Sequence, residues 1–281
     1  MNTFDRYLLR EWLKILGILL CATLGLLFMQ ALYDNFRDLL EMRASAGEVA
    51  YYFAVLMPSF FTLVLPIALL LSLLFVLGQL HRRNEFLALR SAGIGVVRMT
   101  RTIWLAGSLL CIVMAWLNST VIPRSVEASR RLWETLQYRH QAKLGQTGSR
   151  EIVRENFHDD PRLMLVFDRR PIDLSFFELQ RIMDYFAYED NPKFARYAVR
   201  YYGLLADTFV PLIIIAIAIP FAMTGVRVSP AVGVSKSLGL FVLYVLLARL
   251  GTQLGGKEII HPLLAAWLPN LGMAWFVRTM R

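Results

Sequence analysis

The stretch HRRNEFLALRSAGIGVVRMTR, residues 81–101, decides how the rest of the chain is arranged. It is basic and lies between two long apolar runs. From residue 85 to residue 92 apolar side chains recur at helical spacing, and Gly93 follows as a stop signal. These apolar residues are Phe86, Leu87, Leu89 and Ala92. The pattern predicts a short, half-apolar helix held at both ends by membrane spans, which suits being gripped and moved by a partner.

The composition is that of a membrane protein. The chain has 281 residues, of which 57% are hydrophobic, and its mean hydropathy is +0.49. These values are too apolar for an ordinary soluble domain. The net charge of +9 comes from basic residues in loops beside apolar runs, which favours topology-setting charge next to anionic lipid over nucleic-acid binding. Cys21 and Cys111 lie inside apolar runs and are interpreted as packing residues.

Six segments are long and apolar enough, or nearly so, to cross a membrane, since a spanning helix needs about 20 mainly apolar residues. The second is too long for one span, so Pro58 and Pro66 are predicted kinks and the span itself is expected near residues 58–80. The six segments are residues 15–33, 49–80, 102–123, 208–226, 237–256 and 259–277.

The charges that flank these segments predict their orientation. Residues 1–14, 81–101, 225–236 and the C-terminus together hold 12 Lys/Arg and 3 Asp/Glu, whereas the short loops 34–48 and 251–261 hold 3 Lys/Arg and 5 Asp/Glu. By the positive-inside rule both termini and the short helix are cytoplasmic. The expected arrangement is therefore a chain that crosses a membrane several times with both termini in the cytoplasm.

One large polar segment, residues 124–206, is expected outside the membrane. A charged helical stretch at residues 125–143 is followed by predicted strands at 151–156 and 162–168 and by an amphipathic helix at 174–188. The predicted fold is mainly α: six transmembrane helices in a 3+3 arrangement, with a small α+β insertion between the halves. The corresponding domains are residues 1–123, 124–206 and 207–281.

No catalytic motif is present, and the chain is not expected to be an enzyme. GVSKS at residues 233–237 lacks the Gly-Lys pair of a phosphate loop, and no strand precedes it. His158, Asp159 and Asp160 are interpreted as a solvated turn in preference to metal ligands. We expect no cofactor, and we expect any ATP to be bound by a partner.

Three arginines are candidate contacts for an anionic lipid headgroup. Arg37 and Arg43 follow the first span, where the alternative is an ordinary exposed loop. Arg249 lies inside a predicted span, where a charge costs about 2.5–3.5 kcal/mol at the helix centre. Either it faces the bundle, a polar cavity or an anionic ligand, or it snorkels to the nearby membrane surface.

In its order of segments the chain resembles the lipopolysaccharide-export permeases of the LptF/LptG family, and it is somewhat closer to LptG. The resemblance covers most of the chain. It rests on DRYLLREWLK before the first span, on LPIALLLSLLFVLGQL followed by RRNEFLALRSAGI, on LSFFELQRIMDYF with ARYAVRYYGLLADTFVPLIIIAIAIPFAM, and on the ending HPLLAAWLPNLGMAWFVRTMR.

The resemblance implies a permease subunit that extracts lipopolysaccharide from the inner membrane. It implies a second permease of the same family, an ATPase dimer of the LptB type and a single-span LptC-like protein as partners. The helix at residues 82–93 matches the coupling helix, with Glu85 at the acidic position that engages the ATPase. We therefore expect Arg83, Glu85, Phe86, Leu87, Leu89, Arg90 and Gly93 to contact it. The first and fifth spans match the lateral gates through which lipid enters.

The chain departs from the family pattern at two places. The outer segment is too short for the full β-jellyroll that the family carries there, so a reduced jellyroll is expected, which puts the hand-over of lipid along a β-groove in doubt. Ala31 and Asp34 stand near the outer end of the first span, where family members commonly carry Lys or Arg, and Arg37 is the nearest basic residue.

Other interpretations stay open. The short helix also fits a basic interfacial helix that lies flat on lipid, since the helix dipole alone explains an acidic residue at position 85. The whole chain also fits a partner-independent secondary transporter, which predicts discontinuous helices and ionisable residues in midmembrane. A third possibility is a membrane scaffold or sensor. Co-purification of an ATPase discriminates the permease from the other two.

Overall fold

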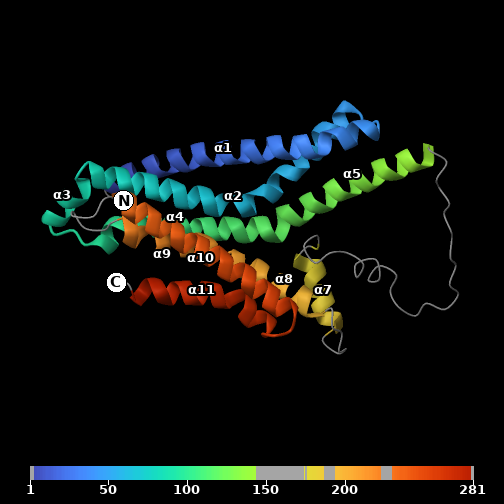
Figure 1. The fold of residues 1–281 in the computed structure, drawn as a ribbon. Coiled ribbons are helices and arrows are strands. Elements are labelled where there is room, and N and C mark those ends of the chain that lie inside the picture. The colour runs from blue at the N-terminus through green and yellow to red at the C-terminus, as the bar shows by residue number, and fades with distance from the viewer. Residues whose placement is uncertain (1–2, 144–173, 175, 187–193, 223–229, 280–281) are drawn as a thin grey trace.

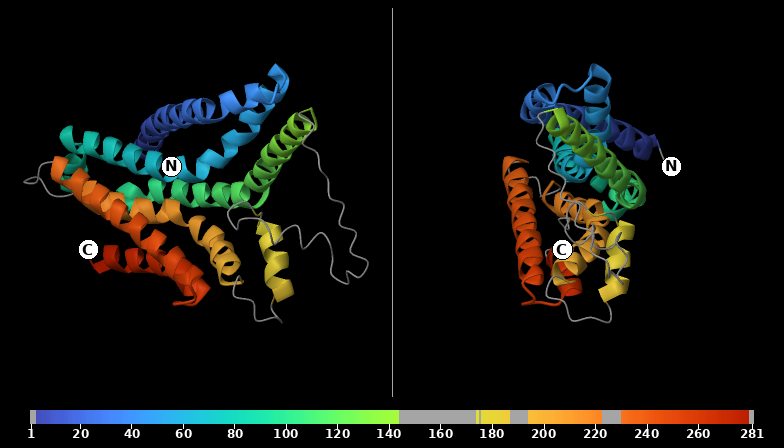
Figure 2. Two further views of the ribbon diagram at one scale, coloured as in Figure 1. Left: turned by 45° about the vertical axis from the view of Figure 1, so that its right-hand side comes forward. Right: turned by 90° about the vertical axis from the view of Figure 1, so that its right-hand side faces the viewer.

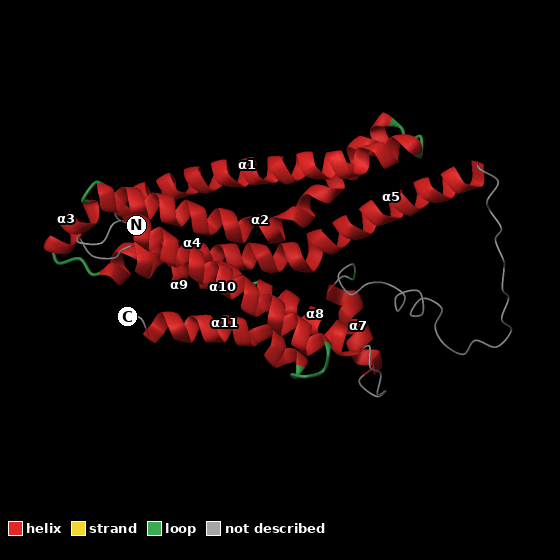
Figure 3. Cartoon of the chain, in the orientation of Figure 1, coloured by secondary structure: helices red, strands yellow, loops and turns green. Residues whose placement is uncertain are grey.

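The computed structural model describes residues 3–143, 174, 176–186, 194–222 and 230–279, and within them every regular element is a helix (Figure 3). In chain order these are α1 (Thr3–Glu41), α2 (Ala46–Arg82), α3 (Glu85–Ser91), α4 (Val96–Trp116), the π-helix η1 (Leu117–Val121), α5 (Ile122–Lys143), α7 (Phe176–Phe186), α8 (Phe194–Asp207), α9 (Val210–Ala222), α10 (Pro230–Gly256) and α11 (Pro262–Thr279).

The long helices run side by side as an elongated bundle (Figure 1). Both ends of the chain and α3 lie at one end of this bundle, and the α1–α2 turn lies at the other (Figures 1 and 2). This arrangement agrees with the predicted even number of crossings. Which side of the membrane the α3 end faces stays a prediction.

Four described helices are long and apolar enough to cross a membrane, and α8 with α9 forms a fifth candidate bent by 52°. The four are Phe4–Glu41, Ala46–Arg82, Val97–Ala142 and Val232–Gly256. The last helix, α11, is 18 residues long and does not belong to this set. A polytopic helical membrane protein is therefore confirmed, whereas the sixth span stays a prediction.

The helices extend further than the sequence predicted. The expected loop 34–48 is helical up to Glu41, and α10 already begins at Pro230 inside the expected loop 225–236. With 39 residues α1 is about 58 Å long, nearly twice the hydrocarbon thickness of a bilayer. Hydropathy assigns polar segments to loops, but a polar segment can continue the helix of the span before it, because water solvates its side chains outside the membrane.

The outer segment is described only in part. The predicted charged helix at 125–143 is present as α5, and the predicted amphipathic helix at 174–188 is present as α7. Leu179 and Ile182 of α7 are buried against Tyr197 of α8. The predicted strands at 151–156 and 162–168 and the turn at 158–161 lie outside the described residues, so the β insertion and the domain boundaries stay predictions.

The main core lies between α1, α2, α4 and α9, and it includes Tyr244 of α10 and Met273 of α11. Of the four single-helix span candidates, α2 is the most enclosed. Trp12 is fully buried, and its indole nitrogen donates to Ser72 Oγ at 3.0 Å, which ties the start of α1 to α2. In its most apolar window α2 has 56% of its residues buried, whereas α1 and α10 have 11% each. The apolar surfaces of α1 and α10 are therefore free for lipid or for another protein.

Candidate functional site

The junction between α2 and α3 turns the chain by means of one left-handed residue. Asn84 has φ 58°, and its N–H donates to His81 O at 3.0 Å. Asparagine tolerates this conformation better than other residues with a side chain, which explains why α2 ends here. Directly afterwards α3 begins with Glu85, so the sequence NE both stops one helix and starts the next.

Glu85 has neighbours within the chain. The Arg83 guanidinium lies 3.9 Å from Glu85 Oε1 and also donates to the Tyr7 hydroxyl of α1 at 3.3 Å. The Glu85 side chain is 30% exposed. The Arg83–Glu85 pair is long and partly exposed to water, so it contributes little stability. A cation of a partner can therefore replace Arg83 at the Glu85 carboxylate.

A Schellman motif closes the other end of α3. Gly93 has φ 79°, its N–H donates to Arg90 O at 3.0 Å, and the Ile94 N–H donates to Leu89 O at 3.1 Å. The side chains of Leu89 and Ile94 both pack against the main core. The short helix is therefore fixed by backbone hydrogen bonds and by an apolar anchor. It spans Glu85–Ser91, which is shorter than the predicted 82–93.

The outer surface of α3 combines apolar and basic side chains. Leu87 is 49% exposed, and Arg90, three residues further along α3, is exposed as well. Phe86 belongs to α3, and the position of its side chain lies outside what the structure describes. Among the described side chains of the predicted apolar face, Leu89 packs inward and Leu87 is exposed, so the structure separates an anchoring residue from a residue available to a partner.

At the opposite end of the bundle, an apolar groove of about 620 Å³ lies between α1 and α2. We call it the outer groove. Sequence analysis missed it, although Phe28, Leu32 and Phe36 are spaced four residues apart on α1 and mark one helix face. Its lining residues are Phe28, Leu32, Phe36, Leu40, Ala44, Ala46, Val49, Ala50, Phe53, Ala54 and Met57.

Two of the predicted headgroup contacts adjoin the outer groove in the sequence, since Phe36 precedes Arg37 and Ala44 follows Arg43. Arg37 pairs with Glu41 at 3.0 Å, and its side chain is 87% exposed. Arg43 has φ 55° and lies in the turn that ends α1. The structure keeps both arginines away from α3, so the predicted site residues form two separate groups.

The third predicted contact, Arg249, lies on an exposed part of α10 and interacts electrostatically with Asp207. Asp207 is the last residue of α8, next to the 52° bend, and also interacts with Arg200. Sequence analysis missed Asp207, although it is an acidic residue directly before a long apolar run. Arg249 is exposed and forms no ion pair among the described residues, so both interpretations of it, facing the bundle or snorkelling to the membrane surface, stay open.

Buried hydrogen bonds brace the same bend. The Asn270 side-chain nitrogen donates to Ala206 O at 3.0 Å, and Asn270 Oδ1 accepts from the Tyr244 hydroxyl at 2.7 Å. Because the bend interrupts the regular helix pattern, backbone carbonyls there need other donors. Asn270 supplies one, and it links α8, α10 and α11.

Comparison with known proteins decides the family. Residues 6–152 and 155–280 match the model of the family described as "Lipopolysaccharide export system permease LptF/LptG". The chain belongs to the LptF/LptG family. Among curated proteins no match is found.

As an LptF/LptG permease the chain is a multi-pass membrane protein of the lipopolysaccharide export system, and the family places it in the inner membrane. The match includes most of residues 124–206, so the outer segment is part of the family homology and not a foreign insertion. The match treats LptF and LptG as one family and does not separate them, so the closeness to LptG stays a prediction.

Proposed function

We propose that this LptF/LptG chain is the subunit that extracts lipopolysaccharide from the inner membrane, driven by a separate ATPase dimer of the LptB type through α3. Extraction needs an energy source, because each CH₂ group moved from lipid into water costs about 0.8 kcal/mol. In this proposal the partner binds ATP. The observation that supports the proposal is the match to the LptF/LptG family.

The geometry of α3 supports its role in coupling. A partner that grips Leu87, Arg90 and Glu85 would push on a helix whose ends are fixed by Asn84 and by the Schellman motif at Gly93. Since Leu89 and Ile94 connect this helix to the main core, a displacement of α3 passes to α2 and α4 without being absorbed by a flexible loop.

The exposed helices support roles for the other expected partners. Since α1 and α10 bury little of their surface within this chain, they are the helices that a second permease or a lipid can cover. We assign them to the lateral gates, and we propose that an LptC-like protein joins the complex. We also propose that the segment between the two membrane halves, residues 124–206, forms a reduced jellyroll.

Lipid contact is proposed at the outer groove, with acyl chains against Phe28 and Phe53 and headgroup phosphates at Arg37 and Arg43. The exposed guanidinium of Arg37 exchanges Glu41 for a phosphate at low cost because the pair is in water. Arg37→Glu is expected to reduce crosslinking to lipopolysaccharide several-fold, with Glu127→Lys as a charge-reversed control. Unchanged crosslinking would remove Arg37 from the site.

The coupling proposal is tested by purifying the chain from membranes with its partners. Glu85→Lys is expected to reduce the amount of co-purifying ATPase several-fold without loss of the folded chain, because a cation then replaces the proposed acidic contact. Glu127→Lys on α5, at the other end of the bundle, is the matched control and keeps the ATPase. Full retention of the ATPase by Glu85→Lys would contradict the role of α3.

One observation favours a second candidate function. A bent span with an acidic residue at its break is a feature of secondary transporters, and Asp207 occupies such a position. Transport by reconstituted protein separates the two functions. The permease requires ATP and its ATPase, whereas a secondary transporter works with an ion gradient alone and fails in Asp207→Asn.

A further inference from the structure

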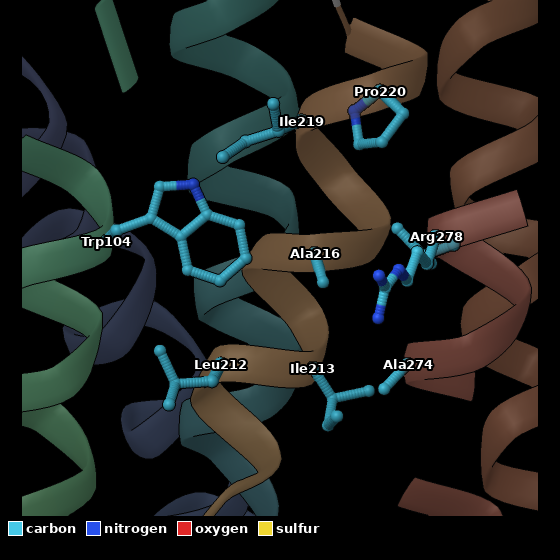
Figure 4. Close-up of a pocket in the computed structure, with 9 residues that line it drawn as sticks. Trp104, Leu212, Ile213, Ala216, Ile219, Pro220, Ala274 and Arg278 are labelled. Atoms are coloured by element: carbon cyan, nitrogen blue, oxygen red, sulfur yellow. The ribbon is translucent and has the colours of Figure 1, made fainter. Parts of the chain in front are cut away.

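A second cavity, of about 340 Å³, lies between α4, α9 and α11 (Figure 4). We call it the tryptophan pocket because Trp104 lines it from α4, facing Ala216 of α9 and Arg278 of α11. Arg278 stands in the last turn of α11, near the C-terminal end of the described chain, so the pocket belongs to the end of the bundle that carries α3 (Figure 1). The outer groove lies at the opposite end.

The walls of the pocket are apolar. Ile213 and Ile219 of α9 line it together with Ala274 of α11, and the Trp104 ring covers one side (Figure 4). Small side chains at positions 216 and 274 keep the space open. An acyl chain fits such walls, because it gains contact with apolar atoms that the protein leaves uncovered.

Arg278 gives the pocket a positive charge. Figure 4 shows its guanidinium over the cavity, directed toward Ala216 and Ala274. No ion pair or hydrogen bond joins it to any residue that the structure describes. The dipole of α11 favours a cation in this turn, but it does not require the guanidinium to turn over an apolar cavity. Arg278 is exposed at the end of α11, so an anion can reach it from outside the protein, and a phosphate matches the planar guanidinium best.

Trp104 adds a polar group to the same space. Its indole N–H has no hydrogen-bond partner among the described residues, and the ring is partly exposed. Tryptophan with an apolar face and a free N–H is typical of the boundary between acyl chains and headgroups. The pocket therefore presents apolar walls with one cation, Arg278, on one side and the indole N–H of Trp104 on the other, near Ile219 (Figure 4).

We propose that the tryptophan pocket binds an anionic glycerophospholipid from the leaflet at the α3 end of the bundle. One acyl chain lies against Trp104 and Ala216, and the phosphate accepts hydrogen bonds from Arg278. The lipid joins α4, α9 and α11 at this end. The inference is independent of the proposed function, because this lipid is a bound component at the end opposite the outer groove and is not the exported cargo.

The test uses the full chain, with the subunits that co-purify with it, in vesicles that contain brominated phosphatidylglycerol or brominated phosphatidylcholine. Bromine quenches nearby tryptophan fluorescence. The chain has 6 Trp, so the signal of Trp104 is obtained by subtracting that of Trp104→Phe. We expect about fivefold preferential quenching by phosphatidylglycerol, the preference that one cation near an anionic lipid confers.

Two variants separate charge from space. Arg278→Gln is expected to abolish the preference, whereas Arg278→Lys retains part of it. Ala274→Phe fills the pocket and is expected to reduce quenching by both lipids. Arg98→Gln is the matched control, since Arg98 is an exposed arginine of α4 that does not line the pocket.

Three results would overturn the proposal. The first is equal quenching by the two lipids in the unaltered chain. The second is a preference that survives Arg278→Gln or falls equally in Arg98→Gln. The third is competition by purified lipopolysaccharide that exceeds competition by unlabelled phosphatidylglycerol, because the pocket would then belong to the cargo.

Discussion

Arg139 of α5 donates a hydrogen bond to Glu48 of α2 at 3.0 Å, across 91 positions in the sequence. Glu48 also completes the capping box at the start of α2, where its carboxylate accepts from the Ser45 N–H at 2.8 Å. One carboxylate thus caps a helix and holds a second helix beside it. The contact lies ahead of residues 58–80, where the sequence predicts the span itself.

The link between α2 and α5 is expected to depend on pH. The hydrogen bonds from the Ser45 backbone and from Arg139 hold the pKa of Glu48 below its ordinary value of 4.5. A lowered folded-state pKa means that the stabilisation is present above 4.5 and is lost as the pH falls through the folded value. Spin labels at positions 51 and 138 are expected to show a broader distance distribution in acid.

Glu48→Gln should broaden the same distribution already at neutral pH. Glu127→Gln removes an ion pair that lies within α5 and is the control. If acid leaves the distance unchanged while Glu48→Gln broadens it, protonation of Glu48 does not release α5.

Asn270 is expected to be important for the stability of the bent span. Asn270→Ala removes both buried hydrogen bonds and leaves Ala206 O without this donor, so the unfolding free energy should fall by about 1–3 kcal/mol. Tyr244→Phe removes only one bond and should cost about 0.6 kcal/mol. Unfolding in detergent measures both, and equal losses would show that Asn270 does not brace Ala206.

Gly251 permits the close approach of α10 and α11. A Cβ atom at this position would meet the carbonyl oxygen of Ala265, which is backbone and cannot move aside. Gly251→Ala should therefore destabilise the chain by about 1–3 kcal/mol. Gly239→Ala in the same helix is the control, because no atom lies within 4 Å of its added Cβ. The thermal unfolding midpoint should fall in the first variant only.

Gly93 is expected to control coupling more than folding. Gly93→Ala places a side chain at φ 79°, which costs about 1 kcal/mol or more and strains the turn that fixes α3. ATP-driven transport should fall while the chain still assembles. Gly95→Ala should have little effect, since Gly95 has φ −69° and no neighbour within 4 Å. Equal effects of the two substitutions on transport would contradict the role of the turn.

Local patterns were enough to predict the helical elements. The segment NEFLALRSAG predicts α3 because its apolar spacing and its terminal Asn and Gly are local signals. The apolar spacing of residues 174–188 likewise predicted α7. Helix lengths were less predictable, because hydropathy locates the apolar part of α1 and α2 and is silent about polar turns that continue the same helix.

Hydropathy, flanking charge and helix-stop residues act locally, so the amino-acid sequence was sufficient to predict a helical membrane protein, and its resemblance to LptF/LptG added the expectation of a permease. The tertiary structure was needed to show that Asn270 bonds to Ala206, that Arg278 faces the tryptophan pocket and that the outer groove lies beside the turn carrying Arg43. Those relationships depend on how helices distant in sequence cross and pack. Packing is decided by shape and by close contacts such as Gly251 against Ala265, which no single segment encodes.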